Sequence, residues 1–136
     1  MKFSSKHIRL IERYFVRQSF KKTDETVQKQ NYDIAVAGDR EIGEDGRARE
    51  PVGSTVDIET ATYTNTIGEA ALSGVWTDPD FDPADDAFYY VRVIEIPKPR
   101  WTTYDAAFFG VPLPENVPPT TQDRAYTSPI WYTAGQ

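Results

Sequence analysis

Side chains that could carry metal or nucleophilic chemistry are scarce in this sequence. Its 136 residues include a single histidine, His7, and no cysteine. A hydrolytic metal site built from imidazoles needs two or three of them, and a general base of the usual kind needs a histidine beside a nucleophile. His7 also stands among basic residues, which is typical of a surface position. We therefore expect no catalytic residue and no metal centre in this chain alone.

The densest acidic segment is residues 78–86, which contains alternate carboxylates at Asp78, Asp80 and Asp82. Carboxylate oxygens are the ligands that calcium prefers. An EF-hand loop is excluded, because Pro83 stands where that loop requires glycine. The interpretation we favour is a capped turn in which each aspartate accepts hydrogen bonds from nearby backbone N–H groups. A weak cation site at the three carboxylates is the alternative.

A second candidate is the run Arg100-Trp101-Thr102-Thr103-Tyr104-Asp105, between a proline corner and an expected helix start. A guanidinium can bind carboxylate or phosphate groups with two parallel donors, and Trp and Tyr offer ring faces with polar tips. One interpretation is that this run lines a pocket. The other, which we favour, is a structural corner in which Asp105 or another acid pairs with Arg100 and Trp101 plugs the sheet.

The composition favours one β-rich globular unit with long loops. Aromatic residues make up 13% of the chain, and ten prolines and eight glycines leave little room for long helices. The formal net charge is −6, so the overall field repels nucleic acid and anionic lipid surfaces. The basic residues crowd the first 22 positions, which we interpret as a solvated face.

No targeting signal is recognisable in the sequence. The N-terminus lacks the apolar run of a signal peptide, and no stretch is apolar enough to span a membrane, so we expect a soluble chain that is cytoplasmic by default.

Alternation of apolar and polar residues predicts an antiparallel sheet or a small β-sandwich, with one or two short helices. We expect a divergent basic segment over residues 1–30 and a β-rich domain over residues 31–136. Strands are expected at residues 32–36, 55–63, 70–77, 87–96 and 125–133, the last at an edge or with a bulge at Pro129. The pattern at residues 7–15 fits a strand and a short helix equally well. Residues 21–30 should form a connection, 40–53 an exposed mobile loop and 111–119 extended surface chain, and a short helix should start at Thr102 or Thr103 and end at Gly110.

Several long strings resemble a known family. They are residues 53–68, residues 75–83 (Val-Trp-Thr-Asp-Pro-Asp-Phe-Asp-Pro), residues 87–97 (Ala-Phe-Tyr-Tyr-Val-Arg-Val-Ile-Glu-Ile-Pro), residues 99–102 and residues 124–132 (Arg-Ala-Tyr-Thr-Ser-Pro-Ile-Trp-Tyr). Together they resemble the C-terminal end of the bacterial family called domain of unknown function 3604, from about residue 32 to residue 132. The sequence departs from that pattern before about residue 24.

The resemblance implies a longer parent protein. Upstream of this region, members look like the polymerase-and-histidinol-phosphatase (PHP) type of metal-dependent hydrolase, whose barrel holds divalent metals with His and Asp side chains. None of those ligands matches a position here. By resemblance, the chain would be a β-rich tail that packs on the barrel and helps to complete its pocket, with Arg100, Trp101, Tyr104 and Arg124 as candidate contacts to a substrate or to the missing domain.

Three functional hypotheses follow. The first is a non-catalytic C-terminal module of a metallohydrolase, which would bind the missing domain or self-associate through exposed apolar surface. The second is a stand-alone small β-sandwich that binds a ligand or a protein. The third is a free-standing enzyme that uses the loop at residues 78–86 with a hard metal.

Overall fold

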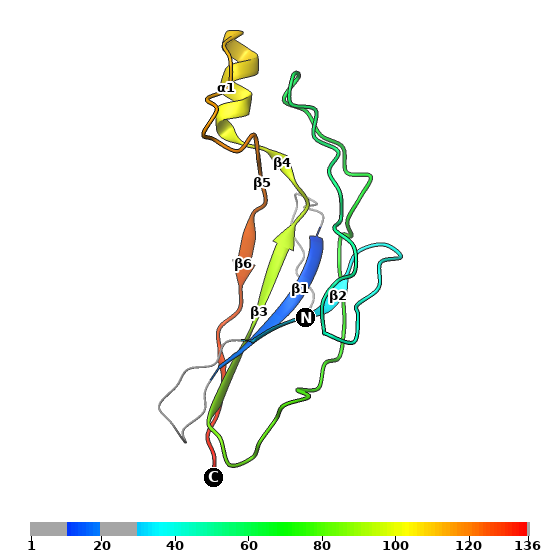
Figure 1. Cartoon of the computed structure of the whole chain (residues 1–136), viewed down its shortest axis with the longest axis vertical. Helices are drawn as coiled ribbons and strands as arrows, with labels where there is room; N and C mark the ends of the chain where they lie inside the picture. The colour runs from blue at the N-terminus through cyan, green and yellow to red at the C-terminus, as the bar shows by residue number, and fades with distance from the viewer. Residues whose placement is uncertain (1–10, 20–29, 136) are drawn as a thin grey trace.

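The computed structural model describes residues 11–19 and 30–135. Its main feature is a five-stranded antiparallel sheet in which β1 (Ile11–Ser19) lies between β2 (Gln30–Val36) and β3 (Ala87–Glu95). On the far side of β3, β6 (Arg124–Tyr126) and β7 (Ile130–Tyr132) pair with its two ends. The mainly β class and the antiparallel sheet are therefore confirmed, and the described residues form this sheet rather than a sandwich of two (Figure 1).

The two central strands pair over most of their lengths. Val16 of β1 lies opposite both Tyr32 of β2 and Val91 of β3. β3 is rich in β-branched and aromatic residues, which favour a pleated strand, and it was the clearest strand predicted. Residues 7–15 were expected as a strand or a helix; from Ile11 onward they are strand, and residues 7–10 lie outside the described residues. The division at residue 30 stays a prediction, although β1 pairs on both sides with strands from the second part.

The outer edge of the sheet is interrupted between β6 and β7. Thr127 bridges the interruption, because its backbone N–H donates to the Val91 carbonyl at 3.0 Å and its hydroxyl accepts from the Val91 N–H at 2.9 Å. Pro129 has no N–H to give to a ladder, so it stands in the gap. The expected edge position is confirmed, but the single strand predicted over residues 125–133 is two short strands with Pro129 between them.

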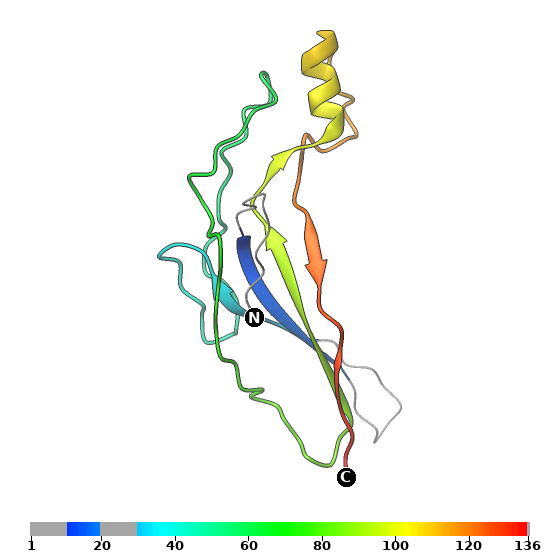
Figure 2. The ribbon, with the colours of Figure 1, turned by 180° about the vertical axis from the view of Figure 1, so that it is seen from behind.

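Beyond β3 the chain extends as an arm. β4 (Lys98–Pro99) pairs with β5 (Thr120–Thr121), and α1 (Trp101–Phe109) stands at the end of the molecule opposite the C-terminus (Figures 1 and 2). An ion pair between Lys98 and Asp123 closes the base of the arm.

The helix ends as expected but starts differently. Gly110 adopts the left-handed conformation with φ of 64° and ends α1, as the sequence predicted. The predicted cap at Thr102 or Thr103 is wrong, because Arg100 is the N-cap and no side chain caps the helix. Thr103 is instead fully buried, and its hydroxyl donates to the Pro119 carbonyl at 2.6 Å. Residues 111–119 form no helix or strand, in line with the extended chain that was expected.

Two predicted strands are wrong. Residues 55–63 form a turn closed by reciprocal backbone hydrogen bonds between Asp57 and Thr62, and the Asp57 carboxylate accepts from the N–H groups of Glu59 and Thr60. Such local bonds compete with pairing in a sheet. Residues 70–77 make no ladder; they pack on the sheet through side chains, where Leu72 contacts Val93.

Asp33 organises the loop that follows β2. This side chain is only 3% exposed, and its carboxylate accepts from the Ala48 N–H at 2.8 Å, while its own N–H donates to the Gly46 carbonyl at 2.8 Å. Residues 40–53 were expected as an exposed, mobile loop; they are exposed or half-buried, and their mobility stays a prediction. Their hydrogen bonds to Asp33 tie this polar loop to the sheet.

The buried hydrophobic residues are aliphatic. Among the residues whose burial the structure describes, six hydrophobic ones are buried, and none is aromatic. They are Ala37, Ala61, Ala87, Val93, Ile94 and Ile96. Among residues 30–135, the large aromatic side chains lie at the surface or are half-buried.

The close approach of Gly74 to β2 gives a testable prediction. A Cβ at this position would lie 2.6 Å from the Ile34 carbonyl oxygen, so the backbone would have to shift. We expect Gly74→Ala to lower the free energy of unfolding by about 1–3 kcal/mol. The neighbouring Ser73→Ala is the control. Urea unfolding followed by tryptophan fluorescence measures both, and equal midpoints for the two variants would contradict the expectation.

Candidate functional site

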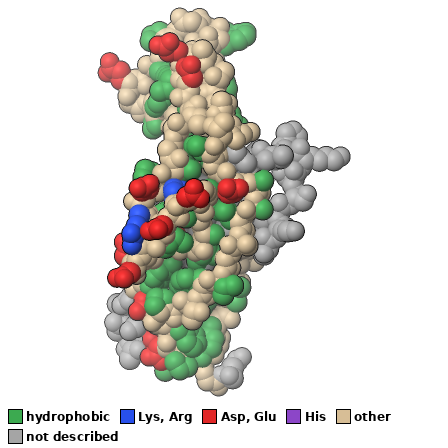
Figure 3. Space-filling model, turned by 90° about the vertical axis from the view of Figure 1, so that its right-hand side faces the viewer, with side chains coloured by type: hydrophobic (Ala, Val, Ile, Leu, Met, Phe, Trp, Pro, Cys, Tyr) green, Lys and Arg blue, Asp and Glu red, His purple; other side chains and the backbone are tan. Residues whose placement is uncertain are grey.

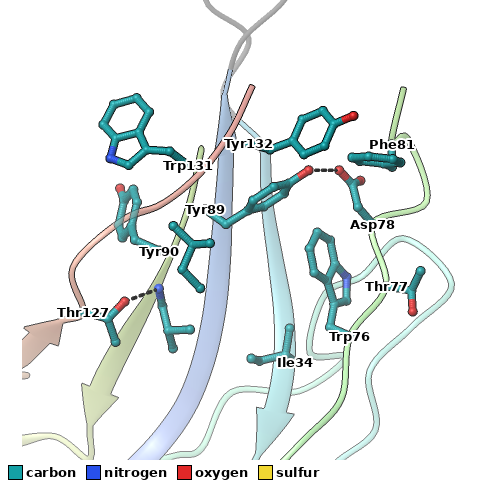
Figure 4. Close-up of a pocket in the computed structure, with 12 residues that line it drawn as sticks. Ile34, Trp76, Thr77, Asp78, Phe81, Tyr89, Tyr90, Thr127, Trp131 and Tyr132 are labelled. Atoms are coloured by element: carbon teal, nitrogen blue, oxygen red, sulfur yellow. Dashed lines mark hydrogen bonds between the residues drawn. The ribbon is translucent and has the colours of Figure 1, made fainter. Parts of the chain in front are cut away.

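The structure contains an open apolar groove of about 800 Å³ on the sheet. This volume lies in the range of small-molecule sites. Figure 4 shows Trp76, Phe81, Tyr89 and Tyr132 on one side, with Trp131 and Tyr90 on the other. The lining residues are Ile34, Trp76, Thr77, Asp78, Phe81, Tyr89, Tyr90, Val91, Thr127, Ile130, Trp131 and Tyr132.

Strand register places the floor of the groove. Tyr89 of β3 lies opposite Ile130 of β7, and Ala87 lies opposite Tyr132. Because side chains alternate between the two faces of a sheet, Tyr89, Val91, Ile130 and Tyr132 share one face. The groove therefore depends on residues about forty positions apart in sequence, brought together by antiparallel pairing.

The segment at residues 76–81 forms the wall. The Trp76 ring packs against Tyr89 with ring centroids 6.1 Å apart, and against Tyr32 at 5.1 Å. Phe81 packs edge-on against Tyr132 at 5.0 Å. These ring contacts hold on the sheet a segment that makes no backbone ladder. Hydrophobic side chains gather beside acidic ones on this side of the molecule (Figure 3).

Two phenol hydroxyls beside the groove already donate hydrogen bonds within the protein. The Tyr89 hydroxyl donates to the Asp78 carboxylate at 2.8 Å, and the Tyr132 hydroxyl donates to the Pro83 carbonyl at 3.0 Å. Burial raises the pKa of the Tyr89 hydroxyl above its ordinary value, and the hydrogen bond to Asp78 and its negative charge raise it further. Both phenol protons are thus engaged, which leaves oxygen lone pairs and ring faces toward the cavity.

The predicted capped turn at residues 78–86 is confirmed. The Asp78 carboxylate accepts from the Asp80 N–H at 3.0 Å, and the Asp82 carboxylate accepts from the Ala84 N–H at 2.8 Å. Asp80 also accepts from the Tyr32 hydroxyl at 2.7 Å. Within residues 11–19 and 30–135, no three His, Cys, Asp or Glu side chains gather in a way that could hold a metal ion. The weak cation site at Asp78, Asp80 and Asp82 stays a prediction.

The other predicted contact residues lie away from the groove. Trp101 and Tyr104 project from α1 with 68% and 44% exposure, and Arg100 precedes the helix. Arg124 is exposed in β6, where it pairs with Ile94. The expectation that Trp101 plugs the sheet is wrong, because its ring is on the surface of the arm. The structure thus brings Arg100, Trp101 and Tyr104 together and leaves Arg124 on the sheet.

Sequence reasoning missed the groove residues Trp76, Phe81, Tyr89 and Tyr132. The alternation within β3 was recognised, and it put Tyr89 and Val91 on a common face. What the sequence did not reveal was which distant segment would cover that face. The paired aromatic and acidic residues of the segment at 76–81 were the available signal.

A second aromatic surface lies on the other face of β3 and extends to the rim of the groove. We call it the aromatic row; it consists of Trp131, Phe88, Tyr90, Tyr126 and Arg92. Phe88 contacts Trp131 at 5.1 Å and Tyr90 at 6.4 Å, and Tyr90 contacts Tyr126 at 6.1 Å between ring centroids. The Arg92 guanidinium lies 5.3 Å from the centre of the Tyr126 ring. Trp131 and Tyr126 are 70% and 59% exposed, so the row is an uncovered apolar strip.

Comparison with protein families matches residues 6–134 to the family described as protein of unknown function DUF3604. The chain belongs to this family. The match covers nearly the whole DUF3604 chain and begins at residue 6, so the expected departure from the family pattern before residue 24 is wrong. Neither the search of curated proteins nor the search of solved structures gave a match. Within the described residues of this DUF3604 chain, no helix has the length and apolar character needed to cross a bilayer.

Tyr32 gives a pH-dependent prediction. Burial, together with the hydrogen bond and charge of Asp80, raises the pKa of Tyr32 to about 12, compared with about 10 in an unfolded chain. A raised folded pKa contributes stability below about pH 10, and this contribution is lost as the pH rises toward 12. We expect Tyr32→Phe to remove one late-titrating phenol and to weaken the alkaline loss of stability.

Phenolate absorbance and urea unfolding across this pH range measure the two effects. Asp80→Asn is the matched control, because it keeps an acceptor for the Tyr32 hydroxyl but removes the charge. We expect it to bring the titration of Tyr32 closer to the ordinary range. An unchanged alkaline titration in both variants would contradict the role given to Asp80.

Proposed function

We propose that this chain is the non-catalytic C-terminal module of a bacterial PHP-like metal-dependent hydrolase. In this proposal it packs on a separate catalytic barrel and helps to complete the pocket of that barrel. The single observation that supports it most is the exposure of large aromatic side chains: among residues 30–135 the buried hydrophobic residues are all aliphatic, and the aromatic ones are exposed or half-buried. A sheet with an uncovered apolar face normally packs against another layer.

Six exposed aromatic side chains lie on two separate surfaces, so a partner that used both would have to contact the arm and the sheet (Figure 1). Six aromatic side chains of about 150–250 Å² each, roughly two thirds exposed, present roughly 600–1,000 Å². A standard interface buries about 800 Å² on each partner. The six are Trp131 and Tyr126 of the aromatic row and Trp101, Tyr104, Phe108 and Phe109 of α1, with exposures from 44% to 83%.

The arm has the shape of a contact element. α1 carries Phe108 at 83% exposure and Trp101 at 68%. Large exposed apolar side chains that lie close together often mark a surface that binds a partner. Its base is fixed by the buried Thr103 hydroxyl and by the Arg100 N–H, which donate to the Pro119 carbonyl at 2.6 and 2.9 Å. A rigid base with an apolar tip suits insertion into a partner. In the proposed complex, Arg100, Trp101 and Tyr104 enter the contact from the arm, and Arg124 joins them from the sheet.

Catalysis and the divalent metal are assigned to the barrel. The only histidine is His7, and no group of three potential ligands gathers among the described residues. In this proposal, the His and Asp ligands lie upstream of this chain, as the family resemblance implies. In the proposed complex, the module provides contact residues for the barrel and its pocket, and the barrel provides the reacting groups.

A stand-alone binding module is the second candidate, and the apolar groove is the observation that favours it. The groove has the volume of a small-molecule site and is lined by six aromatic rings. The surfaces of the two candidates share Trp131 and Tyr90. Separate tests therefore use residues found in only one of them, such as Phe81 of the groove and Phe108 of α1.

Exposure of the aromatic row and α1 predicts self-association of the isolated chain. We expect the 136-residue chain to bind a hydrophobic dye and to form oligomers, measured by size-exclusion chromatography with light scattering. Tyr126→Ser and Phe108→Ser should reduce both signals, because each removes an exposed ring. Val75→Ser is the matched control: Val75 is 98% exposed but lies in neither surface.

The parent protein provides the decisive comparison. We expect the DNA upstream of Met1 to encode an in-frame His-rich barrel, and the barrel to bind the separate chain in a pull-down that Phe108→Ser weakens. A monodisperse monomer without dye binding, combined with no such upstream barrel, would refute the proposal.

A further inference from the structure

We propose that the apolar groove binds a small organic cation, an ammonium group carried on an apolar body. The proposal goes beyond the packing of the module on a barrel and does not depend on it. It rests on three properties of the groove: the sign of its charge, the kind of polar atoms it offers, and the arrangement of its rings.

The charge beside the groove is negative. Of the twelve residues that line it, Asp78 is the only charged one, and none is Lys, Arg or His. Asp80 follows two positions later and is bound to the Tyr32 hydroxyl, so it adds negative charge behind the wall. An anionic ligand would have to face the Asp78 carboxylate, and no cation stands among the twelve lining residues, whereas a cationic ligand would be attracted.

The two phenols and Asp78 favour a ligand that needs no hydrogen-bond donor from them. The hydroxyl protons of Tyr89 and Tyr132 already go to Asp78 and to the Pro83 carbonyl. The Asp78 carboxylate accepts from Tyr89 and from the Asp80 N–H. What these groups still present is lone pairs, which suit a positively charged group. The phenols offer no free donor to the many hydroxyl oxygens of a sugar.

The rings surround the space from more than one direction. Trp76 and Tyr89 lie at 62° to each other, and Phe81 and Tyr132 at 71°. Figure 4 shows these four rings with the Asp78 carboxylate among them. Aromatic faces carry negative potential, and several of them around one point bind quaternary ammonium groups. The volume of about 800 Å³ lies in the range of small-molecule sites, so we assign the groove to a free small molecule.

Choline and its neutral carbon isostere, dimethylbutanol, test the proposal because they share a shape and differ in charge. We expect the full 136-residue chain to bind choline saturably, with an affinity at least about tenfold higher than for dimethylbutanol. Calorimetry and quenching of tryptophan fluorescence measure both affinities. Equal affinity for the two ligands, or no saturable choline binding, would overturn the proposal.

Two variants assign the effect to the groove. Asp78→Asn keeps an acceptor for Tyr89 but removes the charge, and we expect about tenfold weaker choline binding. Phe81→Leu keeps apolar volume but removes a ring face, and should weaken choline binding several-fold while leaving dimethylbutanol binding unchanged. Asp105→Asn, an exposed carboxylate on α1, is the matched control and should change nothing.

The variants also separate this proposal from the packing of the module. If Asp78→Asn does not fold, Phe81→Leu carries the test. Tyr126→Ser and Phe108→Ser are expected to reduce self-association. If these variants still bind choline, the cation site is independent of the aromatic row and of α1. Choline binding that is equally strong in Asp78→Asn and Phe81→Leu as in the unmodified chain would place the ligand elsewhere and overturn the assignment.

Discussion

Antiparallel pairing on both sides of β3 is the constraint on which the rest of the structure depends. β1 occupies one edge of β3 along its whole length, and β6 and β7 share the other. Because side chains alternate, the aromatic residues of β3 are divided between two faces. Tyr89 joins the groove, and Phe88 joins the aromatic row. One strand therefore produces both candidate surfaces, and neither face is covered by a second sheet among the described residues.

The sequence predicted the strands whose own residues alternate clearly between apolar and polar or are rich in strand-forming types. β3 was predicted within one residue of its bounds because it alternates and is rich in β-branched and aromatic residues. The failures have specific physical causes. At residues 55–63 the Asp57 carboxylate binds local N–H groups and closes a turn in place of a strand. At residues 70–77 the alternation correctly predicted that Leu72 and Trp76 share a side of the chain. This segment packs on the sheet through such side chains, but its backbone does not pair with a strand.

The site could be predicted only in part, because its geometry is non-local. Residues of the run beginning at Arg100 were recognised as a cluster, and the structure keeps them together on the arm. The groove joins Ile34, Trp76 and Ile130, which no local pattern connects. Only the register between β3 and β7 and the path of the covering segment bring these residues together. Trp101 was expected to be buried against the sheet, but it is exposed because the arm extends away from the sheet.

The acidic segment shows how one set of side chains can resemble a metal site and yet serve packing. Asp78 and Asp80 each accept a hydrogen bond from a tyrosine of the sheet, and Asp86 accepts from the Ala134 N–H at 2.8 Å. These bonds hold a segment that has no backbone ladder against the strands, and the rings of Trp76 and Phe81 then complete the contact. Carboxylates used in this way leave negative charge beside an aromatic wall. The interactions that build the groove therefore also determine the charge of the ligand it favours.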